Sequence, residues 1–332
     1  GVPVRMIGKI GDDLFGKAIQ DIIRREGVTL AEDLVVDPGA STAFTIILNP
    51  PGFDRSFLHF AGANQTFYAS DLSRATLNEA ALFHFGYPSL MRSIYRGEGG
   101  ELVSILQRAR RAGLTTSLDY SMPDLHSPAG KVDWPLVLAN SLPYVDLFLP
   151  SVEELTYLLQ PETFNAMNEN PHISFMEAIS PELLTALSQR VLAYGVKAVM
   201  IKLGHRGIYL RTASAEVWDK GGRALEGMST SWFNRELWVP AFEVDVRGST
   251  GAGDAAVAGF LASLLKGKDP ETALILAAAA GACSVEQPDA ISGLSIGDTV
   301  LARIKGGWST QPLDLTAAGW QWDKTNGFWE KV

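Results

Sequence analysis

The stretch with the clearest chemical potential runs from Arg247 to Asp254 and reads RGSTGAGD. Its three glycines and two small hydroxyl residues allow a sharp turn with exposed backbone N–H groups. Apolar residues recur at helical spacing over 255–265, and Gly267 is a typical helix stop. A glycine-rich turn entering a helix attracts anions, because unpaired N–H groups and the helix dipole both point there. With Asp254, the stretch combines a candidate phosphate site with a candidate base.

The same residues also allow a purely structural interpretation. Glycine-rich turns often precede helices, and an Asp in the first helical turn stabilises a helix by capping alone. The pattern is not a P-loop, because no Lys-Ser/Thr pair follows the glycines. It is not the dinucleotide fingerprint either, whose glycines come in another order. Spacing alone leaves both interpretations open.

Two motifs together resemble a known family. Residues 251–254 (Gly-Ala-Gly-Asp), followed by an Ala-rich helix, resemble the second signature of the ribokinase-like (PfkB) carbohydrate kinases. Residues 8–16 (GKIGDDLFG) resemble the family's earlier segment, commonly G-x-V-G-x-D-x-F-G. The motifs lie about 240 residues apart in the family's order, and the likeness extends from Met6 to about Leu294. The resemblance implies ATP-dependent phosphorylation of a hydroxyl on a sugar or related small polyol.

The resemblance also implies roles for single residues. Asp254 is the expected general base, and the N–H groups of Gly251, Ala252 and Gly253 are the expected hole for charge on the transferred phosphoryl group. Mg²⁺ is expected to arrive with ATP, since it prefers phosphate oxygens and water as ligands. The expected nucleotide-binding residues are Ser151, Lys202, Gly204, Gly207, Thr250 and Cys283.

Several of these residues have a second interpretation. Ser151-Val152-Glu153-Glu154 takes the place of the family's N-x-x-E motif, whose Glu helps to organise Mg²⁺, so Glu154 is the expected metal residue. Ser-x-x-Glu is equally a capping box, and both roles can coexist. Gly204 and Gly207 fit a plain turn between strands. Cys283 fits a small core residue.

The expected sugar-binding residues are Asp12, Arg55 and Asn64. Structural alternatives stand beside each: the Asp12-Asp13 pair can cap a helix, Arg55 can be a solvated hairpin charge, and Asn64 can be a turn residue. In the family, the region that corresponds to residues 29–71 is a small β-sheet lid over the sugar and often a dimer surface. We therefore expect a homodimer formed through this lid.

Departures from the family pattern limit what is carried over. Gly248-Ser249-Thr250 replaces the common Asp-Thr-Thr, whose Asp contributes to a monovalent-cation site, so dependence on K⁺ stays open. The family's first strand and Gly-Gly motif, expected upstream of Gly8, are not in this sequence, and they carry most of the sugar contacts. Two alternatives remain: a non-catalytic sugar- or nucleotide-binding regulatory protein on the same fold, and a kinase of a nucleoside or phosphosugar.

Composition narrows the class of protein. The 332 residues carry a net charge of −9, whereas a nucleic-acid partner would favour a basic stripe. A single cysteine fits a reducing compartment, and we expect a cytoplasmic protein. No apolar run is long enough to span a membrane. The expected partners are therefore ATP and a small sugar, with neither nucleic acid nor membrane.

Strand and helix patterns alternate along most of the chain. This order predicts an α/β, ribokinase-like doubly wound fold, with a mostly parallel sheet flanked by helices and a small β-sheet lid. We expect a core over residues 1–28 and 72–305, a lid over 29–71 and a tail over 306–332. Ligands bind beyond the carboxyl ends of parallel strands. Strands predicted over 115–118, 145–149 and 198–201 bring Asp119, Ser151, Glu154, Gly204 and Gly207 to that edge.

Three further expectations concern local structure. A strand is predicted over 4–7 and a helix over 12–26, which Gly27 ends. Residues 160–180 are polar and read as an irregular insertion. The tail from Gly306 matches no specific pattern, and its tryptophans are expected to pack on the domain or on a partner subunit.

Overall fold

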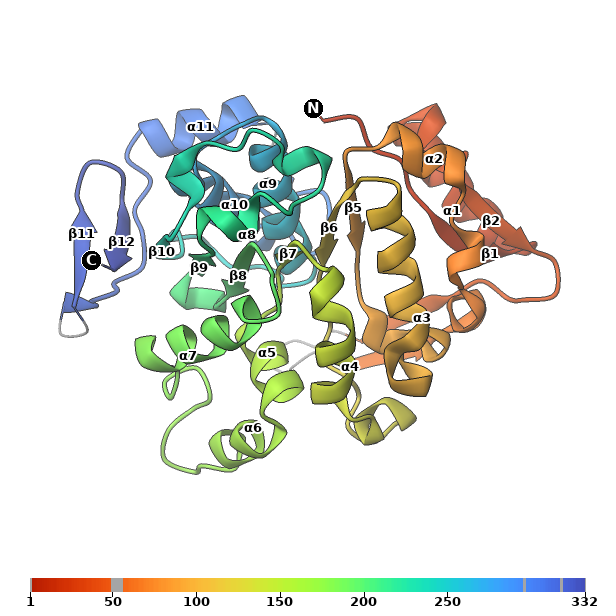
Figure 1. Ribbon diagram of the computed structural model, residues 1–332, viewed down its shortest axis with the longest axis horizontal. Helices are drawn as coiled ribbons and strands as arrows, with labels where there is room; N and C mark the ends of the chain where they lie inside the picture. The colour runs from red at the N-terminus through yellow and green to blue at the C-terminus, as the bar shows by residue number, and fades with distance from the viewer. Residues whose placement is uncertain (1, 49–55, 295–296, 317–318, 332) are drawn as a thin grey trace.

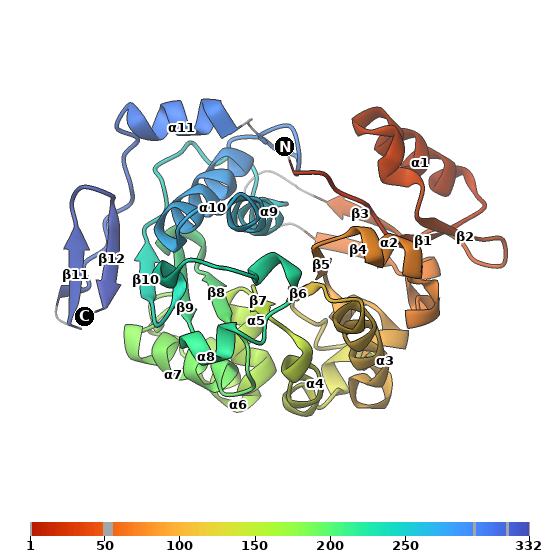
Figure 2. The same cartoon turned by 45° about the horizontal axis from the view of Figure 1, so that its top comes forward.

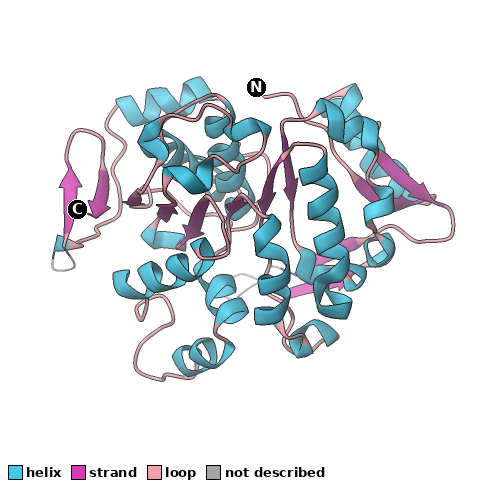
Figure 3. Cartoon of the chain, viewed as in Figure 1, coloured by secondary structure: helices cyan, strands magenta, loops and turns pink. Residues whose placement is uncertain are grey.

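The computed structural model describes residues 2–48, 56–294, 297–316 and 319–331. Its centre is an eight-stranded sheet in the order β11-β12-β10-β9-β8-β7-β6-β5, with helices on both faces (Figures 1 and 2). Two smaller sheets, parallel β1-β2 and antiparallel β3-β4, lie beyond the β5 end (Figure 3). This arrangement confirms the predicted α/β class.

The elements have the following bounds. The strands of the large sheet are β5 (Leu82–Phe85), β6 (Thr115–Leu118), β7 (Leu147–Phe148), β8 (Ala198–Lys202), β9 (Ile208–Thr212), β10 (Glu236–Val239), β11 (Trp320–Asp323) and β12 (Phe328–Lys331). Those of the smaller sheets are β1 (Gly8–Gly11), β2 (Leu34–Asp37), β3 (Phe44–Leu48) and β4 (Ser56–Phe60). The helices are α1 (Leu14–Glu26), α2 (Arg74–Glu79), α3 (Arg92–Arg111), α4 (Trp134–Ser141), α5 (Val152–Leu159), α6 (Pro161–Asn168), α7 (Pro181–Leu192), α8 (Ala215–Trp218), α9 (Ala252–Leu265), α10 (Pro270–Val285) and α11 (Gly297–Lys305).

The large sheet separates two hydrophobic cores. Along β8, Val199 and Ile201 join the core beneath α3, α4, α5 and α7, while Ala198 and Met200 join the core beneath α9 and α10. Successive side chains of a strand point to opposite faces, so a strand covered on both faces is apolar throughout. The run AVMI within β8 has this character, and all four residues are fully buried.

The sheet is mixed. Strands β5, β6, β7 and β8 pair in parallel, whereas β8-β9, β9-β10, β10-β12 and β12-β11 pair antiparallel. The parallel half therefore places the carboxyl ends of β5 to β8 at one edge. The connections after these four strands all reach that edge, where a ligand is expected to bind.

The tail completes the sheet. Strands β11 and β12 form a hairpin that pairs with β10, opposite Leu237 and Trp238. Trp320 and Trp329 are buried against the core, and Trp320 packs edge-on against Trp238 with ring centroids 6.3 Å apart. Packing on the domain is thus confirmed for Trp320 and Trp329, whose rings extend the apolar face of the sheet, whereas Trp322 is exposed.

Some element boundaries differ from the prediction. The first strand forms at Gly8–Gly11, where it pairs with β2, and not over 4–7 as predicted. Helix α1 begins at Leu14 because Asp13 is its N-cap and accepts a hydrogen bond from the Gly16 N–H at 2.8 Å. Residues 160–180 are not wholly irregular: they contain α6, which Pro161 opens at a position that tolerates proline.

The region expected to form the lid, residues 29–71, contains the antiparallel β3-β4 hairpin, which we refer to as the lid hairpin. Every residue of both strands is exposed. Phe44 is its contact with α1, stacking on Phe15 at a centroid distance of 5.1 Å, and it also packs against Phe60 at 5.4 Å. The lid hairpin therefore stands away from the two cores with both of its faces accessible.

Candidate active site

The glycine-rich loop enters α9 as the sequence predicts. Gly251 is the N-cap residue, with a φ of +80° that a residue bearing a side chain rarely adopts. A Cβ at Gly251 would also lie 2.8 Å from the Cβ of Ala290. The loop is fixed to the end of α10, since the N–H groups of Arg247 and Gly248 donate to the carbonyl of Val285. The bend is thus held in a conformation that only glycine satisfies.

Asp254 lies in the first turn of α9 with its side chain exposed. It is not buried among apolar residues, so it can meet a ligand. The Tyr87 hydroxyl, which follows β5, donates a 2.5 Å hydrogen bond to Asp254 Oδ1. Burial raises the pKa of Tyr87 above its ordinary value, and the Asp254 carboxylate adds to the effect. Tyr87 therefore remains a donor.

A lysine lies between this helix and the sheet edge. Lys202 ends β8, and its Nζ is 2.7 Å from Oδ2 of Asp119, the residue after β6. Asp119 is 1% exposed, and burial raises the pKa of its carboxyl while the Lys202 ammonium opposes that change. A Cβ at Gly253 would lie 3.5 Å from Lys202 Nζ. The ammonium group therefore lies beside the loop, at a separation that a Cβ at this position would also allow.

Glu154 is held by the capping box that opens α5. Its Oε2 accepts from the Ser151 N–H at 2.7 Å, and its own N–H donates to Ser151 Oγ at 3.3 Å. The capping-box interpretation is thereby confirmed. Burial raises the pKa of Glu154 to about 7, with Lys202 opposing and Asp119 reinforcing the rise. Ser151 also forms an isolated parallel β-bridge with Lys202, which places the capping box of Ser151 and Glu154 beside the lysine.

His84 on β5 is a neighbour that the sequence did not point to. Its Nδ1 shares a 3.0 Å hydrogen bond with Ser117 Oγ on β6. Partial removal of the imidazole from water lowers the pKa of His84 to about 4, and the charge of Lys202 acts in the same direction. His84 is therefore neutral at physiological pH. The signal that could have identified it is its position on a strand that ends at the same sheet edge.

The other residues expected to bind the nucleotide lie in a turn, in the hydrophobic core and in the glycine-rich loop. Gly204 and Gly207 flank the turn between β8 and β9, with φ of +52° and +93°, so the turn interpretation is confirmed. A Cβ at Gly207 would overlap the carbonyl of Val239. Cys283 is buried in α10, within the core beneath that helix, as the core interpretation expects. Thr250 lies in the loop immediately before Gly251.

The expected sugar-side residues lie near the lid. Asp12 precedes α1 and forms an exposed ion pair with Lys17 at 3.1 Å. Asn64 lies in a short 3₁₀ helix, Gly62–Thr66, whose backbone it helps to close. Arg55 lies outside the described residues. The structure thus brings Asp254, Lys202 and Glu154 together at the carboxyl-end edge of the parallel strands. Asp12 and Asn64 lie in the part of the chain that contains the two smaller sheets.

The chain matches the family model of pfkB family carbohydrate kinases over residues 1–296. The chain belongs to the pfkB family of carbohydrate kinases. It is 26% identical over 294 residues to an uncharacterised sugar kinase of Archaeoglobus fulgidus, covering 89% of this chain and 96% of that protein. It is 27% identical over 303 residues to a probable fructokinase-7 of Arabidopsis thaliana, covering 89% and 76%.

Solved structures show the same fold. A fructokinase with bound ATP from Xylella fastidiosa aligns with a TM-score of 0.69 at 23% identity, covering 92% of this chain and 86% of that one. A putative ribokinase II in complex with ATP and Mg²⁺ from E. coli aligns with a TM-score of 0.67 at 21% identity, covering 92% and 84%. Its membership of the pfkB family makes this protein a phosphotransferase that uses ATP to phosphorylate a sugar hydroxyl.

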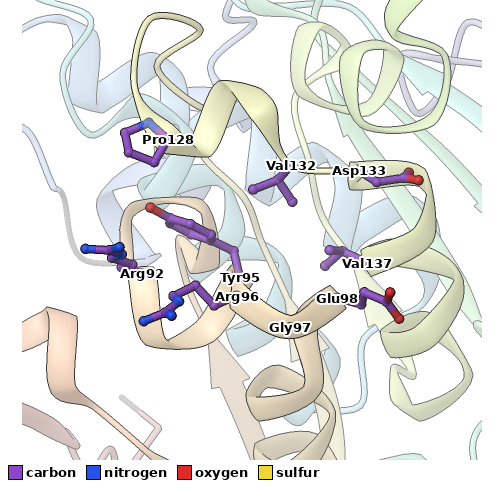
Figure 4. Close-up of a pocket in the computed structure, with 9 residues that line it drawn as sticks. All are labelled: Arg92, Tyr95, Arg96, Gly97, Glu98, Pro128, Val132, Asp133 and Val137. Atoms are coloured by element: carbon purple, nitrogen blue, oxygen red, sulfur yellow. The ribbon is translucent and has the colours of Figure 1, made fainter.

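A surface pocket of this kinase lies apart from the expected residues. A pocket of about 280 Å³ lies between α3 and α4, where the backbone of α3 is non-helical from Arg96 to Gly99 (Figure 4). None of the residues assigned above to ATP, metal or sugar lines it. Among the described residues, no helix is long and apolar enough to cross a membrane.

Proposed function

We propose that this kinase transfers the γ-phosphoryl group of ATP to a sugar hydroxyl with Asp254 as general base. The observation that carries the proposal is the exposed Asp254 carboxylate in the first turn of α9, one residue after the glycine loop. The acceptor hydroxyl gives its proton to Asp254 as its oxygen bonds to phosphorus and ADP leaves. In a loose transition state this proton moves late, so a weak carboxylate base is sufficient.

The loop backbone supplies the anion hole. The N–H groups of Gly251, Ala252 and Gly253 begin a helix whose N-cap offers no side-chain acceptor. Backbone donors and the helix dipole stabilise charge that develops on the transferred group. Lys202 adds a positive charge beside Gly253, so we propose that it contacts the terminal phosphates. Thr250, Gly204, Gly207 and Ser151 lie on the connections that would surround the nucleotide.

Glu154 is the proposed metal residue. Mg²⁺ bound to ATP keeps several water ligands, and a carboxylate at the site orients it through one contact or one water. Glu154 combines a fixed position in the capping box with a pKa that burial raises to about 7, so its carboxyl is only partly ionised near neutral pH. A bound divalent cation would favour the ionised form.

The acceptor is proposed to be a simple sugar held beneath the lid. Several relatives carry the names fructokinase and ribokinase, which makes ketohexoses and pentoses the first candidates. Asp12 and Asn64 are the proposed sugar contacts, and Arg55, which lies outside the described residues, is proposed as a third. A homodimer through the lid is also proposed. Its support is the exposed apolar face of Phe44, Ile46, Leu48, Leu58 and Phe60.

Replacement of Asp254 by Asn tests the central assignment. We expect D254N to lower kcat with a panel of sugars by about 10²- to 10⁴-fold, because general base catalysis contributes on that order. The matched control is D298N, which removes an exposed carboxylate from the first turn of α11. Sugar phosphorylation and ADP release are measured for both variants. Near-normal turnover by D254N would refute the proposed role.

A further inference from the structure

Tyr87 makes the closest contact with the proposed base. Its hydroxyl lies 2.5 Å from Asp254 Oδ1, linking the end of β5 to the start of α9. The two residues are separated by 167 positions in the sequence, so only the fold brings them together. Asp254 is exposed, and an exposed carboxylate without a fixed partner samples several rotamers. The hydrogen bond therefore selects one orientation of the carboxylate.

The backbone at Tyr87 is held in an unusual conformation. Its φ of +60° and ψ of +47° are left-handed, which is rare for an aromatic residue. The N–H of Tyr87 donates to the carbonyl of Asp119 at 3.2 Å, and its own carbonyl accepts from the N–H of Leu90 at 3.1 Å. Ser89 Oγ then donates to the carbonyl of Ser121 at 2.6 Å. Such conformations persist where surrounding contacts enforce them, and they concentrate at functional sites.

We propose that Tyr87 is a positioning residue, which holds Oδ1 of Asp254 so that Oδ2 faces the acceptor hydroxyl. This inference rests on the proposed function of Asp254. During transfer, the acceptor proton passes to Oδ2, the acceptor oxygen bonds to the γ-phosphorus, and the bond from phosphorus to ADP breaks. Tyr87 keeps its own proton throughout, because burial and the adjacent carboxylate keep it protonated.

Asp119 connects the two halves of the site. Its carbonyl accepts from Tyr87, and its carboxylate holds Lys202 at 2.7 Å. The donor to the base and the cation beside the glycine loop are therefore fixed to the same residue at the end of β6. A shift of one would move the other, which keeps the carboxylate and the phosphate site in register. Precise placement of reacting groups contributes strongly to transfer rates.

The test is Tyr87→Phe, which removes the hydroxyl and keeps the ring. We expect Y87F to lower kcat about tenfold, because the loss of a hydrogen bond to a charged group typically costs about that much. The KM for ATP should change by less than about twofold. The matched control is Y157F on α5, whose hydroxyl contacts the carbonyl of Gly130 at 3.5 Å. Y157F keeps normal kcat.

A double-variant cycle separates positioning from a structural role. If Tyr87 acts through Asp254, Y87F changes the residual turnover of D254N by less than about twofold, because residues that act as a unit are not additive. A full tenfold loss in the D254N background would overturn the inference. So would a kcat for Y87F equal to or above that of the unmodified enzyme. Either result leaves the role of Asp254 intact, whereas normal turnover by D254N alone would remove the proposed function itself.

Discussion

Two buried lysine–aspartate pairs in this kinase allow a catalytic contact to be separated from a stabilising one. Lys202 pairs with Asp119 at 2.7 Å, at the carboxyl end of β8, beside the glycine loop. Lys197 pairs with Asp146 at 2.9 Å, before the other end of the same strand. Both aspartates are at most 1% exposed. The pairs share their chemistry and burial, and they differ in distance from the proposed phosphate site.

Replacing either lysine by Met leaves a buried carboxylate without its lysine. Breaking a buried pair in this way costs about 3–5 kcal/mol. For a chain of 332 residues, an unfolding entropy of about 2.1 cal/mol/K per residue gives about 0.7 kcal/mol/K. K202M is therefore expected to lower Tm by about 4–7 °C. K197M should lower Tm by a similar or smaller amount, because Arg110 remains 3.5 Å from Asp146.

Turnover should distinguish the two variants. Kinetics are measured at 20 °C, after circular dichroism has shown both proteins to be folded at that temperature. We expect K202M to lower kcat/KM for ATP by about 100-fold, as expected when a charged contact to the transferred phosphoryl group is lost. K197M should stay within about twofold of the unmodified enzyme. Equal losses in both variants, or near-normal turnover by K202M, would show that Lys202 only stabilises the fold.

Two further predictions concern Glu154 and the lid. The fold raises the pKa of Glu154 from 4.5 to about 7, so the folded protein keeps a proton that the unfolded chain has lost. Its contribution therefore lowers stability as pH rises from about 4.5 to 7. In Mg²⁺-free buffer, we expect E154Q to raise Tm at pH 8 but not at pH 4.5. The control variant E153Q, in the same turn, should show no such pH-dependent gain. A gain of equal size at both pH values for E154Q would contradict this prediction. L58D, placing a charge on a side chain that is 58% exposed, should lower the sedimentation coefficient of a lid dimer, and an unchanged oligomer would exclude this face.

Much of the geometry around the proposed nucleotide site could be predicted from sequence, because it depends on local structure. The turn at Gly251, the helix carrying Asp254 and the capping box of Ser151 and Glu154 each lie within a few adjacent residues. Glycine at a left-handed position and a hydroxyl three residues before a glutamate are local rules. The alternating strand and helix patterns likewise indicated which loops meet at one edge, and Asp119 does meet Lys202 there.

The tryptophan-rich tail shows the opposite case. Its strand β12 pairs with β10, through partners that lie 91 and 93 residues apart in the chain, and no local pattern in the tail indicates that partner. Similarly, the first strand lies at Gly8–Gly11 rather than earlier, because pairing with β2 selects its register. Propensity restricts which residues can form a strand, whereas pairing and burial decide which of them do.

By itself, the sequence determined the glycine loop, its acid and the α/β alternation, since each depends on neighbouring residues and backbone preference. Only the tertiary structure decided that Tyr87 meets Asp254 and that Lys202 meets Asp119, across 167 and 83 positions. Those contacts follow from the parallel order of β5, β6, β7 and β8 and from the packing of α9 against the sheet. Strand order and helix packing depend on burial of the whole core, and that is a property of the chain as a unit.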